Sequence, residues 1–295
     1  MIKITDISWE ELDAIDRQSA VVFLSIAPIE EHGKHLPLGV DLFLTEKWQA
    51  DTIKCIESAK ENIQCITFPA IPFGYAELRG FNGNFHIDIK TLKKIVLISL
   101  NNIVKWGFKN IVVLSGHADP LHLIAIECCC DAINKKHGEI VIAPMGALFS
   151  ASEKENMQNE EDPQVANMIA SFPNDFHAGW IETSAMLDIN AQLVKKNYSE
   201  MPDVLVFPQD MLNSAYISKK TKGYGHFGYP GKASKDMGTI LNNDMAENLY
   251  HIVMQFINRE NYMQYKHHSL HNLLKSQLIA KCFSLFSIFI PRGKE

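Results

Sequence analysis

Short apolar runs alternate along the chain with longer stretches whose apolar residues recur at helical spacing. The run at residues 20–27, AVVFLSIA, is apolar almost throughout rather than at every second position, which is typical of a parallel strand covered on both faces. Similar runs predict further strands at residues 64–69, 110–115 and 139–144. Longer amphipathic patterns predict helices at residues 42–58, 88–106, 120–136 and 234–258.

Strands separated by helices favour right-handed crossovers, and therefore parallel neighbours in one sheet. We expect an α/β fold in which helices flank a mostly parallel central sheet on both faces. The polar stretch at residues 152–163 is predicted to be a surface excursion.

The C-terminal part of the chain has a different pattern. We expect residues 1–262 to form one domain and residues 263–295 to form a helical C-terminal extension. Its apolar run at 278–290 is shorter than the roughly 20 residues that a membrane-spanning helix needs. We expect this run to pack on the body or on a neighbouring subunit, and contact with a membrane surface is the alternative.

The composition excludes several classes of protein. Hydrophobic residues make up 46% and charged residues 21% of the 295 positions, as in globular proteins, so the chain as a whole is not disordered. The net charge of −6 argues against a protein that coats nucleic acid, because such a protein needs a basic surface. No apolar run reaches the roughly 18 residues that indicate a transmembrane helix.

The cysteines and the N-terminal residues favour a cytoplasmic protein. Three of the six cysteines are consecutive, at 128–130, and none forms a CxxC pair, so a disulfide framework is not indicated. The first residues, MIKITDISWEELDAID, carry acids where a signal peptide needs an apolar stretch. We expect reduced thiols, with at most two of the consecutive cysteines on the buried side of a helix.

The segment PIEEHGKHLPLGVD directly follows the first predicted strand, where open α/β sheets place their binding crevices. Imidazole and carboxylate together suit Zn²⁺, Mn²⁺ or Fe²⁺. In an extended segment Glu30 and His32 lie on one face, and the chain can turn back to bring Asp41 to the same place. A polar loop whose charges are merely solvated is the alternative.

Two further segments carry candidate chemistry. The third predicted strand ends in SGHADP, in which one residue separates His117 from Asp119. Further along, HAGWIETS places His177 five residues before Glu182 at the start of a predicted helix. His177 and Glu182 can form a catalytic pair. The alternative is that Glu182 only stabilises the N-terminus of the helix and that His177 only caps it.

Taken together, these segments resemble the creatininase (creatinine amidohydrolase) family. The family signature E-x-H-G-x-H-L-P-L-x-x-D is filled at every fixed position by EEHGKHLPLGVD. The family's GH motif matches residues 116–117, and its HAGxxETS motif matches residues 177–184. The resemblance covers roughly residues 1–260 and implies a creatininase-like α/β hydrolase domain, assembled as a homo-oligomer, specifically a hexamer.

The resemblance implies a site with two divalent metal ions, Zn, Mn or Fe, that activate a water. Glu30 and His32 would each bind one ion, Asp41 would bridge them, and His117 would join the first. The fifth protein ligand is left open between two residues, Asp119 and Glu182.

The remaining residues of the signature have implied roles as well. His177 would act as the acid/base beside the substrate, and His35 would support the loop by hydrogen bonding. The glycine-rich stretch GYGHFGYPG could bring Tyr224 and His226 onto the substrate, or it is an ordinary surface loop.

The implied reaction is hydrolysis of an amide or cyclic amide of a small molecule. Ala118 stands where creatininase has a tyrosine, and Pro173 where it has a tryptophan, so we expect a substrate other than creatinine. A non-catalytic metal-binding or assembly protein on the same scaffold is the alternative. A nucleotide-binding oxidoreductase would need a glycine-rich turn after the first strand, where this chain is acidic.

Overall fold

The structure is a computed structural model that describes residues 1–59, 63–78, 80–150, 162–207, 214–221 and 223–275. Its centre is a sheet of five parallel strands in the order β1-β3-β2-β4-β5. The strands are β1 (Ile2–Lys3), β2 (Val21–Ser25), β3 (Cys65–Thr67), β4 (Ile111–Leu114) and β5 (Val141–Ile142). The expectation of an α/β fold around a parallel sheet is confirmed.

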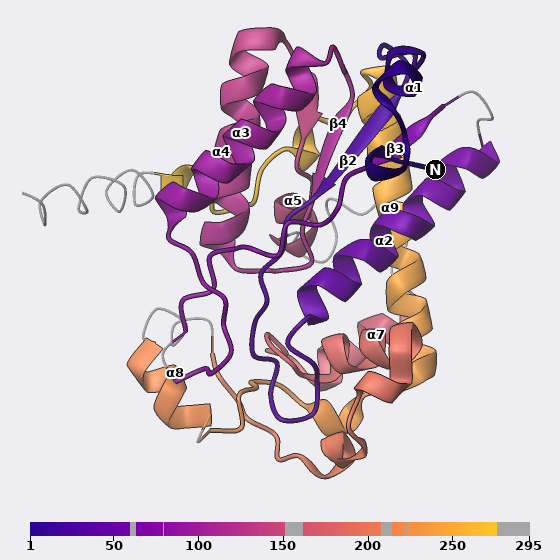
Figure 1. Cartoon of the computed structure of the whole chain (residues 1–295). Coiled ribbons are helices and arrows are strands. Elements are labelled where there is room, and N and C mark those ends of the chain that lie inside the picture. Colours follow the sequence, from indigo (N-terminus) through magenta and orange to yellow (C-terminus); the bar gives the residue numbers. More distant parts are fainter. Residues whose placement is uncertain (60–62, 79, 151–161, 208–213, 222, 276–295) are drawn as a thin grey trace, which may run out of the picture.

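Helices cover both faces of the sheet (Figure 1). In β2, Val21 and Phe23 pack in the core with α2 (Val40–Ala59), α7 (Trp180–Asn190) and α9 (Lys235–Asn258), whereas Val22 and Leu24 pack with α3 (Ile89–Lys105) and α4 (Pro120–His137). Every residue of β2 is buried, which explains why its sequence is apolar at consecutive positions. The helices are α1 (Trp9–Asp13), α2 (Val40–Ala59), α3 (Ile89–Lys105), α4 (Pro120–His137), α5 (Met145–Ser150), α6 (Pro163–Ser171), α7 (Trp180–Asn190), α8 (Ser214–Thr221) and α9 (Lys235–Asn258).

The long helices begin where the sequence provides a cap. The Asp88 side chain accepts the N–H of Thr91 at the start of α3, and the Ser234 side chain accepts that of Met237 at the start of α9. The four predicted strands are all present, as are the four long predicted helices and the helix predicted at Glu182, which is α7, although β3 and β5 are shorter than predicted. The prediction did not include β1, α1, α5, α6 or α8.

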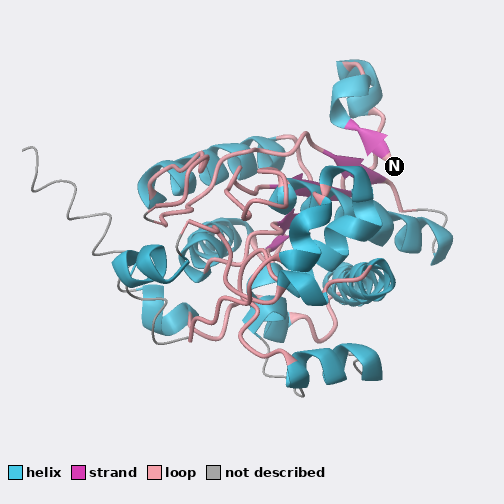
Figure 2. Ribbon diagram, turned by 90° about the horizontal axis from the view of Figure 1, so that it is seen from below, coloured by secondary structure: helices cyan, strands magenta, loops and turns pink. Residues whose placement is uncertain are grey.

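The loops that follow the strands come together on one side of the sheet. Seen from below, Figure 2 shows these loops meeting between the surrounding helices. The loop after β2 leads into α2, and the loop after β4 leads into α4. Because all strands are parallel, their carboxyl ends share one edge, and the candidate residues lie along it.

The part of the predicted extension that the structure describes packs against the body. Tyr265 is buried in the core cluster that contains α2, α7 and α9, and Lys266 pairs with Glu139 at 2.8 Å. The apolar run at 278–290 lies outside the described residues, as does nearly all of the predicted surface excursion. The boundary at residue 262 therefore stays a prediction.

The expectations of unpaired cysteines and of no membrane-spanning helix agree with the described residues. Cys129 and Cys130 are buried in α4 while Cys128 is partly exposed, and none of the five cysteines in the described ranges forms a disulfide. Within those ranges, no helix combines the length and the apolar character that a bilayer crossing requires.

Candidate metal centre

Four separate segments bring the candidate ligands together at the carboxyl edge of the sheet. Glu30 and His32 lie in the loop after β2, and Asp41 lies in the first turn of α2. His117 follows β4, and Glu182 lies in the first turn of α7. The first four are buried, and the Glu182 side chain is 17% exposed.

Asp41 stands between two groups of candidate ligands. Its Oδ1 lies 3.3 Å from His32 Nε2, and its Oδ2 lies 3.3 Å from His117 Nδ1. Glu30 Oε2 is 3.0 Å from His117 Nδ1, and Glu182 Oε2 is 3.7 Å from His32 Nε2. The ligand atoms of Glu30, Asp41 and His117 lie within 4.8 Å of one another, and so do those of His32, Asp41 and Glu182.

The two imidazoles direct lone pairs toward these carboxylates. His32 Nδ1 lies 3.1 Å from the backbone carbonyl of Glu30, and His117 Nε2 lies 2.9 Å from that of Tyr75. A carbonyl only accepts, so in the neutral rings these two nitrogens carry the protons. The other nitrogens, His32 Nε2 and His117 Nδ1, are then acceptors that face carboxylate oxygens, which are acceptors too.

The same atoms lack hydrogen bonds. Glu30 Oε2, His32 Nε2 and Asp41 Oδ2 are buried and have no hydrogen-bond partner. Buried acceptors that face one another need a proton or a metal ion between them. Imidazole nitrogens and carboxylate oxygens are the donor set that Zn²⁺, Mn²⁺ or Fe²⁺ prefers, so the residues present fit a divalent metal ion.

The electrostatics of the site point the same way. Burial alone would lower the pKa of His32 and of His117, but the neighbouring carboxylates raise both pKa values well above the ordinary one. Burial alone would raise the pKa of Asp41, and the two imidazoles instead lower it. For Glu182, burial is likewise outweighed, chiefly by His32, and its pKa is lowered. The site therefore holds ionised carboxylates and attracts positive charge.

The glycine of the GH motif has a structural reason. A side chain at Gly116 would place its Cβ 2.5 Å from the backbone oxygen of Asp41, which is closer than real contacts allow. Gly116 N–H also donates to Thr45 Oγ1 at 2.6 Å, and that hydroxyl donates to the Asp41 carbonyl. The first turn of α2 is thus held against the end of β4, which fixes Asp41 beside His117.

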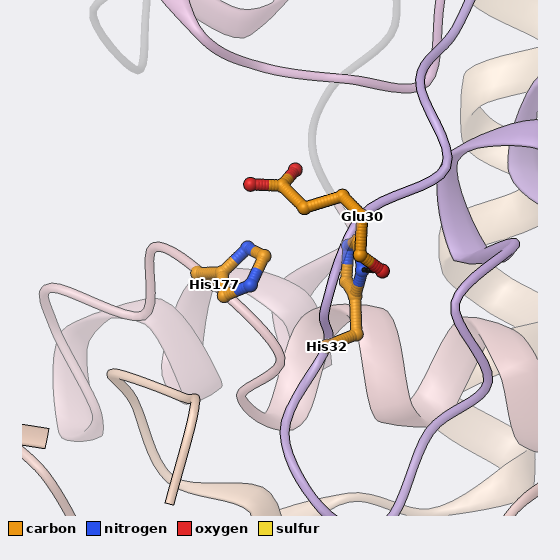
Figure 3. Close-up of side chains that lie close together, drawn as sticks. All are labelled: Glu30, His32 and His177. Atoms are coloured by element: carbon orange, nitrogen blue, oxygen red, sulfur yellow. Dashed lines mark hydrogen bonds between the residues drawn. The ribbon is translucent and has the colours of Figure 1, made fainter. Parts of the chain in front are cut away.

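The HAG segment brings His177 to the same place. His177 and Phe227 exchange backbone hydrogen bonds of 3.1 and 2.9 Å, and their rings are stacked with centroids 5.2 Å apart. His177 Nε2 donates to the carbonyl of Glu31 at 2.6 Å. Figure 3 shows its ring beside that of His32, with the Glu30 carboxylate extending above it. Glu30, His32 and His177 also offer ligand atoms within 4.8 Å of one another.

Asp119 has a different position from the other predicted ligands. It is the N-cap of α4, where its Oδ1 accepts the N–H groups of Leu121 and His122 at 2.7 and 3.0 Å. It belongs to none of the ligand groups that the described residues form, whereas Glu182 does. The geometry therefore favours Glu182 over Asp119 as the fifth ligand.

The other residues of the signature have mainly supporting contacts. His35 is buried, and its Nε2 hydrogen-bonds Thr183 Oγ1 at 2.9 Å, which agrees with the role in the loop expected from the sequence. Burial lowers the pKa of His35 to about 4. His226 is buried, with its ring centroid 5.9 Å from that of His35, and its Nε2 donates to the carbonyl of Pro202. Tyr224 is partly exposed at the loop surface, beneath the Lys34 ammonium.

Sequence reasoning missed Asp175, which organises the start of α7. Its carboxylate accepts backbone N–H groups from Trp180 and Ile181, both at 3.0 Å, and from Tyr229 at 2.8 Å. A Cβ at Gly179 would clash with that carboxylate, which explains the glycine of the HAG motif. An Asp shortly before a predicted helix is a capping signal that could have identified it.

Two residues that position His117 were also not predicted from the sequence. Tyr75 contacts His117 directly, and His122 acts through Tyr75. Tyr75 supplies the carbonyl that accepts from the ring, and its N–H donates to His122 Nδ1 at 3.2 Å. His122 is fully buried, and burial followed by the nearby His117 lowers its pKa to about 3, so it is neutral and can accept. A backbone carbonyl carries no sequence signal, so the role of Tyr75 could not be found in this way.

The comparison with known proteins agrees with this geometry. The model of the creatininase family, described as creatinine amidohydrolase, matches residues 5–253. The chain belongs to the creatininase family. A creatinine amidohydrolase of Pseudomonas putida is 24% identical over 245 residues, which cover 74% of this chain and 88% of the relative.

Solved structures of the creatininase family have the same fold. A mutant creatininase superposes with a TM-score of 0.68 at 18% identity, covering 86% of this chain and 98% of that one. A putative creatinine amidohydrolase from Bacteroides fragilis gives 0.65 at 19% identity, covering 88% and 98%. Other creatininase structures of similar likeness are described as a manganese form, a zinc–zinc type and a complex with creatine.

Proposed function

We propose that this protein is a metal-dependent amidohydrolase that cleaves an amide or cyclic amide bond of a small molecule at a site with two divalent ions. One observation carries the proposal: Asp41 presents one carboxylate oxygen to each of two groups of buried ligands. Glu30 and His117 would hold one ion, His32 and Glu182 the other, and Asp41 would bridge them. Bound there, the ions would supply Lewis-acid activation of a water and of the amide carbonyl.

The charge of the site supports two ions rather than one. Glu30, Asp41 and Glu182 contribute three carboxylates, while His32 and His117 would be neutral once a metal ion replaces the proton on the nitrogen that faces the carboxylates. Three negative charges in a buried site exceed what a single divalent cation neutralises. Two divalent ions would compensate these three charges and leave the site with net positive charge.

The chain's own contribution to the reaction is assigned to His177. An amine leaves poorly as an anion, so the departing nitrogen needs a proton, which a positioned imidazole can deliver. The ring of His177 is fixed by stacking on Phe227 and by the hydrogen bond to the Glu31 carbonyl, and it lies 4.4 Å from the ring of His32. That position puts a proton carrier next to the proposed metal ligands.

The substrate is proposed to be an amide other than creatinine. This rests on Ala118 and Pro173, which stand where creatininase has aromatic residues. Ala118 is exposed in the structure and cannot supply an aromatic wall. Relatives named for creatinine hydrolysis and a neighbour with bound creatine support a small nitrogen-rich ligand for the family.

Turnover of an amide panel tests the function. Protein purified without chelator is assayed against linear amides, cyclic amides and creatinine, before and after chelation and after readdition of Zn²⁺ or Mn²⁺. We expect hydrolysis of at least one amide in preference to creatinine, loss on chelation and recovery with metal. Metal-loaded, folded protein that hydrolyses none of them would instead support the non-catalytic metal-binding alternative.

A further inference from the structure

A second group of metal-type ligands lies away from the candidate metal centre. Asp131 on α4 and two histidines of the C-terminal segment, His267 and His271, offer ligand atoms within 4.8 Å of one another. Asp131 is eleven residues beyond the start of α4, about 16 Å along the helix, so the group is distinct from the site that contains His117. The C-terminal histidines also lie beyond residue 253, where the match to the family model ends.

His271 is oriented as a metal ligand would be. Its Nδ1 donates to Glu127 Oε2 at 2.6 Å, and Glu127 is buried and also accepts the backbone N–H of His268 at 2.8 Å. A carboxylate that takes the proton of one ring nitrogen leaves the other free to bind a cation. That other nitrogen, Nε2, lies 3.6 Å from Asp131 Oδ2.

His267 completes the group. Its Nε2 lies 3.0 Å from Asp131 Oδ1, and its ring is tilted against that of His271 with centroids 4.0 Å apart. The side chain is 39% exposed, so a proton displaced from Nε2 can move to Nδ1 and be hydrated there. Ligands of a tetrahedral ion with bonds of about 2.1 Å lie about 3.4 Å apart, which these spacings approach.

A cation already contacts two of the three ligand residues, Asp131 and His271. The ammonium of Lys275 lies 3.5 Å from Asp131 Oδ2 and 3.4 Å from His271 Nε2. Its side chain is 45% exposed on a flexible stem, so it can withdraw into water when a stronger cation binds. In this arrangement, acceptor atoms of Asp131 and His271 therefore already face a positive charge.

We propose that Asp131, His267 and His271 form a separate Zn²⁺ site that ties the C-terminal segment to α4. Two imidazoles and one carboxylate are a ligand set that zinc takes, with Glu127 holding the orientation of His271. The role of this site would be structural, because it joins α4 to a C-terminal segment that Tyr265 and the Lys266–Glu139 pair also anchor to the body. It does not depend on the number of ions at the candidate metal centre.

The zinc content of matched variants tests the proposal. Full-length protein is loaded with excess Zn²⁺, freed of loosely bound metal by gel filtration and analysed for zinc per chain. We expect His267→Ala and Asp131→Asn to hold about one equivalent less than the wild type, with unchanged circular dichroism. His137→Ala, at an exposed histidine in the last turn of the same helix, should keep the wild-type count.

A second measurement keeps the result interpretable. Added zinc should raise the thermal midpoint of chelator-treated wild type and of His137→Ala by more than that of His267→Ala, because one stabilising site is missing in the latter. Equal zinc counts in all four proteins would overturn the proposal and leave the cluster as an ion-pair network.

Discussion

Substitutions of Asp41 and Asp119 distinguish the proposed bridging ligand, Asp41, from the residue that caps α4, Asp119. We expect Asp41→Asn to bind divalent metal at least about tenfold more weakly than the wild type. Mutation of residues that only hydrogen-bond to metal ligands already weakens binding by about tenfold or more, so loss of a ligand should cost at least as much. Asp119→Asn should retain metal, since asparagine preserves the cap of α4 that the structure shows. Elemental analysis of both variants after the same dialysis provides the comparison. Equal retention would contradict the bridging role of Asp41.

His177 tests the assignment of the proton carrier. His177→Gln keeps an N–H that can donate to the Glu31 carbonyl but cannot transfer a proton, so the loop geometry is preserved. We expect unchanged metal content and a rate lower by about 10²–10⁴-fold. Rate and metal must be measured on one sample. Loss of an ion would make His177 a ligand, and an unchanged rate would leave it a structural role only.

For single residues, the sequence motifs predicted the side chains that gather at the candidate metal centre. Glu30, His32, Asp41, His117 and Glu182 were all named from motif positions, and the structure brings them together. It could not decide between Asp119 and Glu182, because that choice depends on how the segment before α7 folds back onto the loop after β2. The supporting carbonyl of Tyr75 was also out of reach, since every residue has one.

Among the elements, α7 is held at its start by hydrogen bonds from backbone N–H groups to the carboxylate of Asp175. Asp175 accepts three backbone N–H groups, from the first turn of α7 and from the strand-like segment that ends at Tyr229. Asp175→Ala leaves these donors without their partner, and we expect the free energy of unfolding to fall by at least about 2 kcal/mol. Urea denaturation measures it, and Asp162→Ala, at the exposed start of α6 where one N–H is capped, is the control. Similar losses in both would show that Asp175 is an ordinary cap.

The elements that could be predicted are those with an unambiguous pattern. β2 is buried on both faces and therefore apolar without interruption, and α3 and α4 carry capping residues at their starts. β1 has two residues, and α5 has six, so neither is long enough to show a period. Their positions follow from tertiary contacts: β1 pairs with β3, and α5 packs beside α4 and the C-terminal segment.

For the whole molecule, we expect a homo-oligomer, specifically a hexamer, from the resemblance of the sequence motifs. Sedimentation velocity at several concentrations measures the assembly directly. A single species of about one chain mass, 33.3 kDa, at all concentrations would contradict the expectation.

The central claim is that one buried site holds two divalent ions through a shared carboxylate. Elemental analysis of the His267→Ala variant, purified without chelator, measures this number, because the substitution removes the proposed C-terminal zinc site from the metal count. We expect about two equivalents of divalent metal per chain in this variant and a much lower count in the double variant His267→Ala with Asp41→Asn. Less than one equivalent, even after incubation with Zn²⁺ or Mn²⁺, would contradict the dinuclear site.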